Sequence, residues 1–230
     1  MSRLIAALVR HGDYHQLPGA PSAHQPFALN ERGETQARDA GAVLAELLQR
    51  EAWTLYPLID SSQMLRAWQT ARLIADQLGG PEIQCFDALA ERGVGCAANL
   101  TVAQIEAVLR DDPRYPAPPP GWKADSHYRL PLQGAESLLQ AGERVAGHLR
   151  RSMATLRDTG LREDTLKVYV GHGAAFRHAA HHLGVLAFED IAKLSMYHGV
   201  PVLLENLPDD SWRQVGGQWK RRGAGEEFKD

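Results

Sequence analysis

The chain has 230 residues, of which 44% are hydrophobic and 23% are charged. These values are typical of a soluble globular protein with a sizeable core, and one domain is the better expectation for this length. The formal net charge of −3 offers no basic excess for nucleic acid, and no apolar run is long enough to span a bilayer. The first residues lack the features of a signal peptide, so we expect a cytoplasmic protein that binds neither nucleic acid nor membrane.

The N-terminal part alternates between strand-like and helix-like segments, which predicts a layered α/β domain. Residues 4–9 form an unbroken apolar run, as expected for a central strand that is buried on both faces. Residues 31–50 predict a helix with one apolar face, and residues 54–59 predict a second strand. The side chains of residues 60–62 are suited to cap the next helix, which we expect to end near Leu78, before two glycines.

The segment over residues 92–133 differs from the rest, because it contains several glycines and a proline-rich stretch. Such a segment cannot supply a central strand, so we predict a cap-like insertion over one end of the sheet. The remaining pattern predicts helices at 137–156 and 174–183, and strands at 166–170, 200–204 and 212–215. We therefore expect a single domain over residues 1–218 and a charged flexible tail over residues 219–230.

Two histidines follow directly after predicted buried strands, in Arg10-His11-Gly12 and in Gly171-His172-Gly173. In α/β sheets, ligands bind beyond the carboxyl ends of the strands. Histidine can act as a nucleophile or a base, and arginine presents a fork of donors that suits phosphate. The helix expected after Gly173 presents N–H groups and a positive dipole end to an anion. The two histidines would meet only if their strands were neighbours, which the sequence alone leaves open.

Two further charged residues lie near the ends of predicted strands. Arg66 falls in the first turns of the helix after residues 60–62, and Glu91 comes just before the insertion. Arg66 alone is equally consistent with a surface salt bridge, and Glu91 alone is not distinctive.

Taken together, these elements resemble the histidine phosphatase superfamily, which includes the phosphoglycerate mutases. The resemblance covers about residues 4–204 and implies a three-layer α/β/α fold with a mixed, mostly parallel central sheet. The segments that carry it, in the family's order, are Leu8-Val9-Arg10-His11-Gly12, residues 29–37, Ser61-Ser62 with Arg66, Leu89-Ala90-Glu91, Gly134-Ala135-Glu136-Ser137 and Gly171-His172-Gly173.

The resemblance also implies a role for each site residue. His11 would be the nucleophile that takes the phosphoryl group, with its other ring nitrogen bound to a backbone carbonyl. Glu91 would protonate the leaving group and later activate water. The phosphate oxygens would be surrounded by Arg10, Arg66, His172 and Gly173. Two arginines and a protonated second histidine mask the phosphate charge without a metal, so we expect no cofactor.

The leading hypothesis is a metal-independent phosphatase that acts on a phosphorylated small molecule or a phosphoprotein, including phosphohistidine. The first alternative is a phosphomutase, but phosphoglycerate mutases carry a glutamate and a tryptophan–asparagine pair after the first histidine motif. Here the chain reads Asp13-Tyr14-His15-Gln16-Leu17. The second alternative, a non-catalytic phosphate-binding scaffold, should have lost a catalytic position, and none is lost.

Three other histidines have roles that the sequence leaves open. His178 and His182 are four residues apart and could share a helix face, but no acidic partner at metal-site spacing is nearby, so we expect no metal. His198 precedes the strand predicted at residues 200–204 and could approach the site. That strand and the one at residues 212–215 offer an edge through which two copies could form a homodimer.

Overall fold

The structure, a computed structural model, describes residues 2–21 and 24–223. In chain order its strands, α-helices and two short 3₁₀ helices are β1 (Leu4–Arg10), α1 (Glu31–Arg50), β2 (Thr54–Leu55), β3 (Leu58–Ser62), α2 (Leu65–Gln77), β4 (Glu82–Phe86), η1 (Asp87–Leu89), η2 (Gly95–Ala97), α3 (Val102–Asp111), α4 (Leu138–Asp158), β5 (Thr165–Gly171), α5 (Gly173–His182), α6 (Phe188–Ile191), β6 (Leu194–Ser195), β7 (Val202–Asn206), β8 (Trp212–Gly216) and β9 (Lys220–Arg221).

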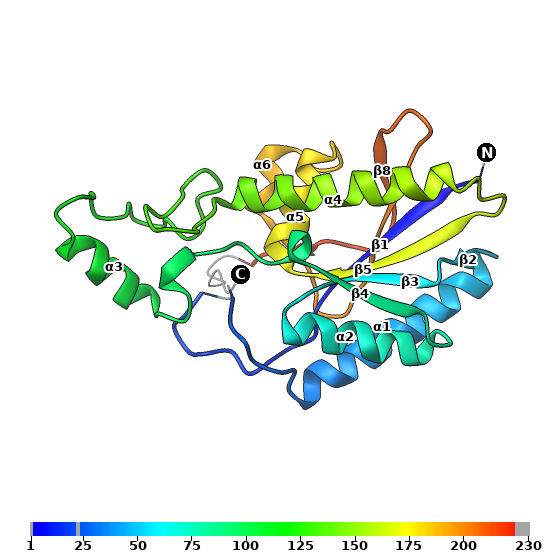
Figure 1. The fold of residues 1–230 in the computed structure, drawn as a ribbon, viewed down its shortest axis with the longest axis horizontal. Coiled ribbons are helices and arrows are strands. Elements are labelled where there is room, and N and C mark those ends of the chain that lie inside the picture. Colours follow the sequence, from blue (N-terminus) through cyan, green and yellow to red (C-terminus); the bar gives the residue numbers. More distant parts are fainter. Residues whose placement is uncertain (1, 22–23, 224–230) are drawn as a thin grey trace.

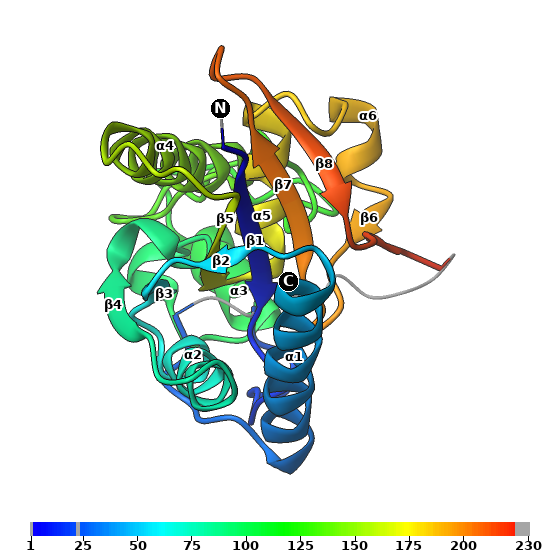
Figure 2. The same ribbon diagram turned by 90° about the vertical axis from the view of Figure 1, so that its right-hand side faces the viewer.

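A seven-stranded sheet lies between two layers of helices (Figures 1 and 2). Its strand order is β4-β3-β5-β1-β7-β8, with β2 paired to β5. The β1/β5, β2/β5, β3/β5 and β3/β4 pairs are parallel, whereas β7 is antiparallel to both β1 and β8. The expected three-layer fold with a mixed, mostly parallel sheet is therefore confirmed.

The central strand β1 is apolar from Leu4 to Val9 because both of its faces are covered. Leu8 packs in the core cluster that contains residues of α4 and α5, whereas its neighbour Val9 packs in the cluster that contains residues of α1 and α2. Successive side chains of a strand point to opposite faces, so a strand buried on both sides needs an apolar residue at every position.

The first helix begins and ends where the sequence predicts. Its start is fixed by Asn30, whose side-chain oxygen accepts from the Gly33 N–H at 2.8 Å. The strand predicted at residues 54–59 is instead two strands, β2 and β3, separated at Pro57, which has no N–H for the ladder. Residues 60–62 belong to β3 and do not cap α2, which has no side-chain cap bond at Met64. The half-exposed edge strand β4 was not predicted.

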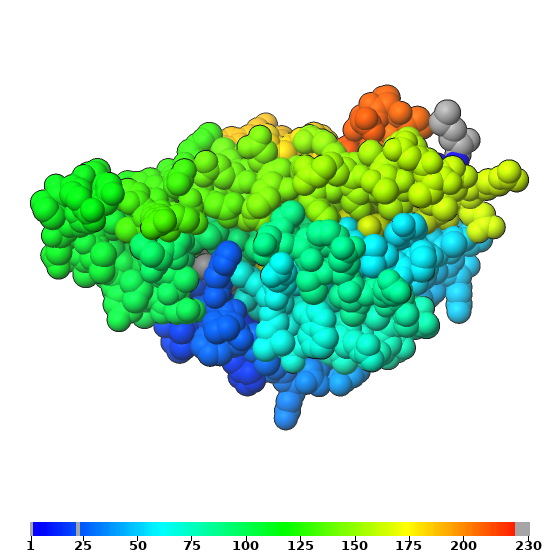
Figure 3. All heavy atoms as spheres, in the orientation of Figure 1, coloured from blue at the N-terminus to red at the C-terminus, as the bar shows by residue number. Residues whose placement is uncertain are grey.

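The insertion over residues 92–133 forms the green lobe at one end of the molecule (Figure 3). It contains η2, α3 and a small apolar cluster around Ile105 and Trp122. Its two ends lie against each other, since Val94 forms a bridge with Ala135 and the Cys96 N–H donates to the Gln133 carbonyl at 3.0 Å. This short stem joins the insertion to the main body.

The C-terminal segment is more ordered than its composition predicts. Lys220 and Arg221 form β9, which pairs antiparallel with β6, so the expectation of a flexible tail from residue 219 is wrong for these two residues. Residues 224–230 of the predicted tail lie outside the described residues. None of the helices within the described ranges combines the length and the apolar character needed to cross a lipid bilayer.

Candidate active site

The register of the sheet brings the two predicted histidines together. Arg10 at the end of β1 lies opposite Gly171 at the end of β5, so His11 and His172 are the next residues on two neighbouring parallel strands. Their ring centroids are 5.0 Å apart. The condition that the sequence leaves open, that these strands be neighbours, is therefore met.

His11 is buried, and the contacts of both ring nitrogens define its tautomer. Nδ1 lies 2.7 Å from the Gly12 carbonyl oxygen and donates to it, as expected, while Nε2 accepts from Arg66 Nε at 3.2 Å. Burial lowers the pKa of His11 well below 6.5, and nearby positive charges, first among them Arg66, lower it further. The ring is therefore neutral with its lone pair on Nε2, the form that a nucleophile requires.

Arg66, on the first turn of α2, links several parts of the site. Its guanidinium is fully buried, donates through Nη1 to the Gln25 carbonyl at 2.8 Å and lies 4.5 Å from the centroid of the Tyr14 ring. Burial lowers the pKa of Arg66, while Tyr14 and Glu91 act in the opposite direction. Arginine stays protonated in proteins, so this position supplies a fixed positive charge beside His11.

His172 is also neutral, which differs from the protonated histidine assumed from the sequence. Its Nδ1 is 3.3 Å from Nη2 of Arg66 and its Nε2 is 2.9 Å from the Ser62 hydroxyl. Burial is the largest cause that lowers the pKa of His172 well below 6.5, followed by the charge of Arg66. The positive charge of the site therefore comes from its arginines.

Arg10 and Gly173 fit together at the start of α5. The Arg10 guanidinium donates through Nη1 to the Met196 carbonyl at 3.0 Å. A Cβ on Gly173 would lie 3.0 Å from Cδ and 3.1 Å from Nε of Arg10. The glycine thus leaves room for the arginine beside the N-terminus of α5, where helix N–H groups favour an anion.

Gly12 lies directly against the backbone at the start of α1. A Cβ on Gly12 would lie 2.2 Å from the backbone oxygen of Gly33, and a Cβ on Gly33 would lie 1.8 Å from that of Asp13. Gly12 is therefore required for close backbone packing against the start of α1.

Glu91 is buried and its carboxylate is held by two backbone N–H groups. Oε1 accepts from Arg92 at 2.8 Å, and Oε2 accepts from Ala174, in the first turn of α5, at 3.3 Å. The structure thus brings all five predicted side chains, from β1, α2, the segment after η1 and the end of β5, to one end of the sheet.

Three further residues lie at the site, and the sequence assigned no defined role to any of them. Ser62 contacts His172, and Tyr14 lies edge-on to the His11 ring with centroids 5.4 Å apart. His198 is a third imidazole at 5.4 Å from His11, and its Nδ1 lies 2.6 Å from the His11 carbonyl oxygen. Only its place before a predicted strand hinted at its position.

His178 and His182 contact the base of the insertion and α4. His178 donates from Nδ1 to the Ala174 carbonyl at 2.7 Å and contacts the Ser126 hydroxyl through Nε2 at 3.0 Å. His182 Nε2 lies 3.0 Å from the Leu139 carbonyl. Burial lowers the pKa of His178 to about 3. In the part of the chain that the structure describes, no group of three or more His, Cys, Asp or Glu could hold a metal ion.

Comparison with known proteins gives consistent results. Residues 6–214 match the family model of the histidine phosphatase superfamily (branch 1). A 2,3-bisphosphoglycerate-dependent phosphoglycerate mutase of Thermobifida fusca is 26% identical, over 95% of this chain and 93% of that protein. A mutase of the same name from Cutibacterium acnes is 29% identical, over 83% of this chain and 81% of that protein.

Two solved structures share the fold. A mycobacterial glucosyl-3-phosphoglycerate phosphatase superposes with a TM-score of 0.67 at 23% identity and covers 94% of this chain and 97% of its own. The α-ribazole phosphatase of Shigella flexneri superposes with a TM-score of 0.67 at 17% identity and covers 97% of this chain and 100% of its own.

Proposed function

Because the chain belongs to branch 1 of the histidine phosphatase superfamily, we propose that it is a metal-independent phosphatase that hydrolyses phosphomonoesters through a phosphohistidine on His11. The observation that carries the proposal is the His11 ring, whose Nδ1 donates to Gly12 and whose Nε2 faces the guanidinium of Arg66. A neutral nucleophilic nitrogen beside a fixed cation is the arrangement that attack on a phosphate dianion needs.

In the first step, the lone pair of His11 Nε2 attacks phosphorus and the bond from phosphorus to the ester oxygen breaks. Glu91 gives its proton to the departing oxygen, so the alcohol leaves neutral and Glu91 becomes a carboxylate. General acid assistance of this kind contributes about 10²- to 10⁴-fold in rate.

In the second step, water attacks the phosphoryl group on His11 while Glu91 takes one of its protons. The bond from phosphorus to nitrogen breaks, inorganic phosphate leaves, and neutral His11 and protonated Glu91 are restored. Throughout, Arg10 and Arg66 would neutralise the charge of the phosphate oxygens. A bound dianion would also raise the pKa of His172 and so favour its protonated form.

The substrate that we propose is a phosphorylated small molecule or a phosphoprotein. The size of the insertion over residues 92–133 and its place beside Glu91 support a role in substrate selection, since such loops carry specificity on a rigid scaffold. A phosphomutase is the second candidate, and the mutase relatives at 26% and 29% identity favour it. The two functions differ in whether water or a second hydroxyl group receives the phosphoryl group.

The test is release of p-nitrophenol from p-nitrophenyl phosphate in the presence of a chelator, with wild type compared with His11→Ala. We expect turnover by wild type at the same rate with and without chelator, and none above background by the variant. Phosphorus NMR of a mixture with 3-phosphoglycerate and 2,3-bisphosphoglycerate separates the candidates, because a phosphatase gives inorganic phosphate and a mutase gives an isomer. Loss of activity with chelator, or full activity of His11→Ala, would overturn the proposal.

A further inference from the structure

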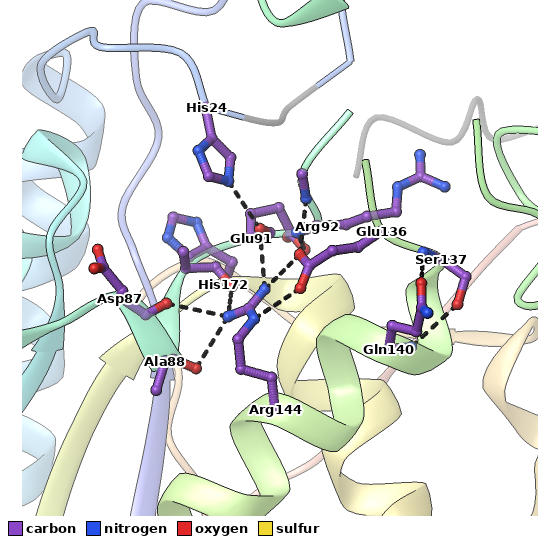
Figure 4. Close-up of polar contacts among 12 residues, drawn as sticks. His24, Asp87, Ala88, Glu91, Arg92, Glu136, Ser137, Gln140, Arg144 and His172 are labelled. Atoms are coloured by element: carbon purple, nitrogen blue, oxygen red, sulfur yellow. Dashed lines mark hydrogen bonds and ion pairs between the residues drawn. The ribbon is translucent and has the colours of Figure 1, made fainter. Parts of the chain in front are cut away.

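The guanidinium of Arg144, on the second turn of α4, is the centre of a polar cluster behind Glu91 (Figure 4). Through Nη1 it donates to three carbonyl oxygens of the turn that precedes Glu91, those of Asp87 at 3.2 Å, Ala88 at 3.0 Å and Ala90 at 3.1 Å. Through Nη2 it also reaches the Glu91 carbonyl at 3.5 Å. One side chain from α4 therefore fixes the backbone of the whole turn.

The same guanidinium binds Glu136 through two parallel contacts. Nε and Nη2 of Arg144 lie 2.9 and 2.7 Å from the two carboxylate oxygens of Glu136. Burial raises the pKa of Glu136, but the hydrogen bonds from Arg144 and from the Gly93 N–H together lower it by more. The pKa of Glu136 therefore lies below its ordinary value. The pair is therefore ionised at neutral pH, and its two-point geometry is the strong form of a charge-assisted bond.

Glu136 carries this connection to the stem of the insertion. Its Oε2 accepts from the Gly93 N–H at 3.1 Å, and its own backbone N–H donates to the Gly93 carbonyl at 2.8 Å. Arg144 thus holds, in one contact network, both the turn that carries Glu91 and the place where the insertion leaves and rejoins the body. Only Arg92 separates Glu91 from Gly93, so the two cannot move independently.

We propose that Arg144, with Glu136, is a positioning residue that holds the Glu91 carboxylate at the reacting oxygen and couples it to the insertion. This inference rests on the proposed role of Glu91 as general acid. Arg144 itself touches backbone and Glu136, and it acts on the reaction only through Glu91. A displacement of about 1 Å at a catalytic group can cost about 100-fold in rate.

Arginine is required here because the network uses its planar fork. One edge binds the carboxylate of Glu136 while Nη1 reaches three carbonyl groups at once. The ammonium group of lysine has three donors at a single point and cannot serve two such partners together. Arg144→Lys should therefore retain the charge and lose the geometry.

The experiment measures kcat/KM for a series of phosphate monoesters from p-nitrophenyl phosphate to alkyl phosphates. The proteins are wild type, Glu91→Gln, Arg144→Met, Arg144→Lys and the Glu91→Gln/Arg144→Met double variant. Arg151→Met, an exposed arginine on the same helix, is the matched control for the loss of one charge and for the substitution itself. Thermal melting of each variant measures stability separately.

A general acid matters most for poor leaving groups, so displacement of Glu91 should make kcat/KM depend more steeply on the leaving group. We expect Arg144→Met to lose about 10- to 100-fold on alkyl phosphates and less than about 3-fold on p-nitrophenyl phosphate. Arg144→Lys should lie close to Arg144→Met, Arg151→Met should match wild type, and the double variant should resemble Glu91→Gln alone. These results together would support the inference.

Two other results have distinct meanings. In the first, Glu91→Gln loses more kcat/KM on alkyl phosphates than on p-nitrophenyl phosphate, while Arg144→Met loses the same factor on every substrate. Arg144 then has only a structural role and the inference is overturned. If Glu91→Gln itself loses the same factor on every substrate, the proposed function of Glu91 fails, and the inference fails with it. Should Arg144→Met not fold, Glu136→Gln is the second variant, because it keeps the shape and one oxygen of the side chain but removes its charge. It must show the same selective loss in smaller measure, and a uniform loss would overturn the inference.

Discussion

At the scale of single residues, the site depends on which nitrogen of each histidine carries the proton. The Gly12 carbonyl places the proton of His11 on Nδ1, and burial beside Arg66 keeps the ring neutral. His172 is neutral for the same reasons. The cost of holding two uncharged imidazoles beside arginines should appear in the pH dependence of stability.

We predict that the free energy of unfolding falls as the pH is lowered below 6.5. The folded-state pKa values of His11 and His172 are lower than the unfolded value, so below pH 6.5 the unfolded chain binds more protons. The free energy of unfolding should be fully retained above pH 6.5. Below that pH, each of the two histidines should lower it by up to about 1.4 kcal/mol per pH unit until the folded-state pKa is reached. Urea unfolding at several pH values checks this, and His172→Asn should reduce the slope. Equal slopes for wild type and His172→Asn would refute the assignment.

His198 gives a second prediction at this scale, because its Nδ1 contacts the backbone oxygen of His11, the proposed nucleophile. Removal of one such bond in His198→Ala should lower kcat/KM by about 2- to 10-fold. His198→Asn retains a short side-chain donor and should recover most of the loss. If the alanine and asparagine variants were equally impaired, the ring itself, and not the hydrogen bond, would be what the site uses.

At the scale of elements, the N-terminus of α5 and the end of β1 approach so closely that a side chain at position 173 would press on Arg10. A Cβ on Gly173 would lie within 3.3 Å of three atoms of Arg10. The same helix start supplies the Ala174 N–H that binds Glu91. The position of α5 therefore sets the place of Arg10, the arginine proposed to bind phosphate, and of the proposed acid together.

Gly173→Ala should accordingly displace Arg10 and raise KM for p-nitrophenyl phosphate. Loss of one charge-assisted bond corresponds to about 10- to 100-fold in binding. Gly147→Ala is the control, since its Cβ would meet only the flexible end of Arg151 at 3.2 Å, and alanine is the better helix former. Steady-state kinetics of both variants decide the matter, and a Gly173→Ala enzyme with unchanged KM would show that Arg10 does not bind the phosphate.

At the scale of the whole molecule, the sequence predicts individual helices and strands better than it predicts which of them are neighbours. The helix at residues 31–50 is confirmed to the residue and the strand at residues 4–9 to within one, because their apolar patterns and caps are local. The break between β2 and β3 at Pro57 and the edge strand β4 were not predicted, since neither produces the apolar pattern of a buried face. Local patterns do not encode which strands are neighbours, so the meeting of His11 with His172 required the fold or the family resemblance.

The residues that support the site were the hardest to predict. His198 and Arg144 lie 187 and 53 positions from the residues whose carbonyl oxygens they contact. Asp60, which resembled a helix-cap residue, lies inside the sheet and is bound by Lys167 at 2.7 Å and His148 at 2.8 Å. Such contacts depend on tertiary packing, and no spacing rule in one sequence identifies them.

The proposed function depends on the transfer of a phosphoryl group to His11, and the phosphorylated enzyme can be trapped. Wild type and His11→Ala are mixed with p-nitrophenyl phosphate, quenched rapidly in alkali, which preserves phosphohistidine, and mapped by mass spectrometry. We predict a phosphoryl group on His11 of the wild type, and neither label nor turnover in the variant. A phosphoryl group on another residue, or undiminished turnover by His11→Ala, would contradict the account.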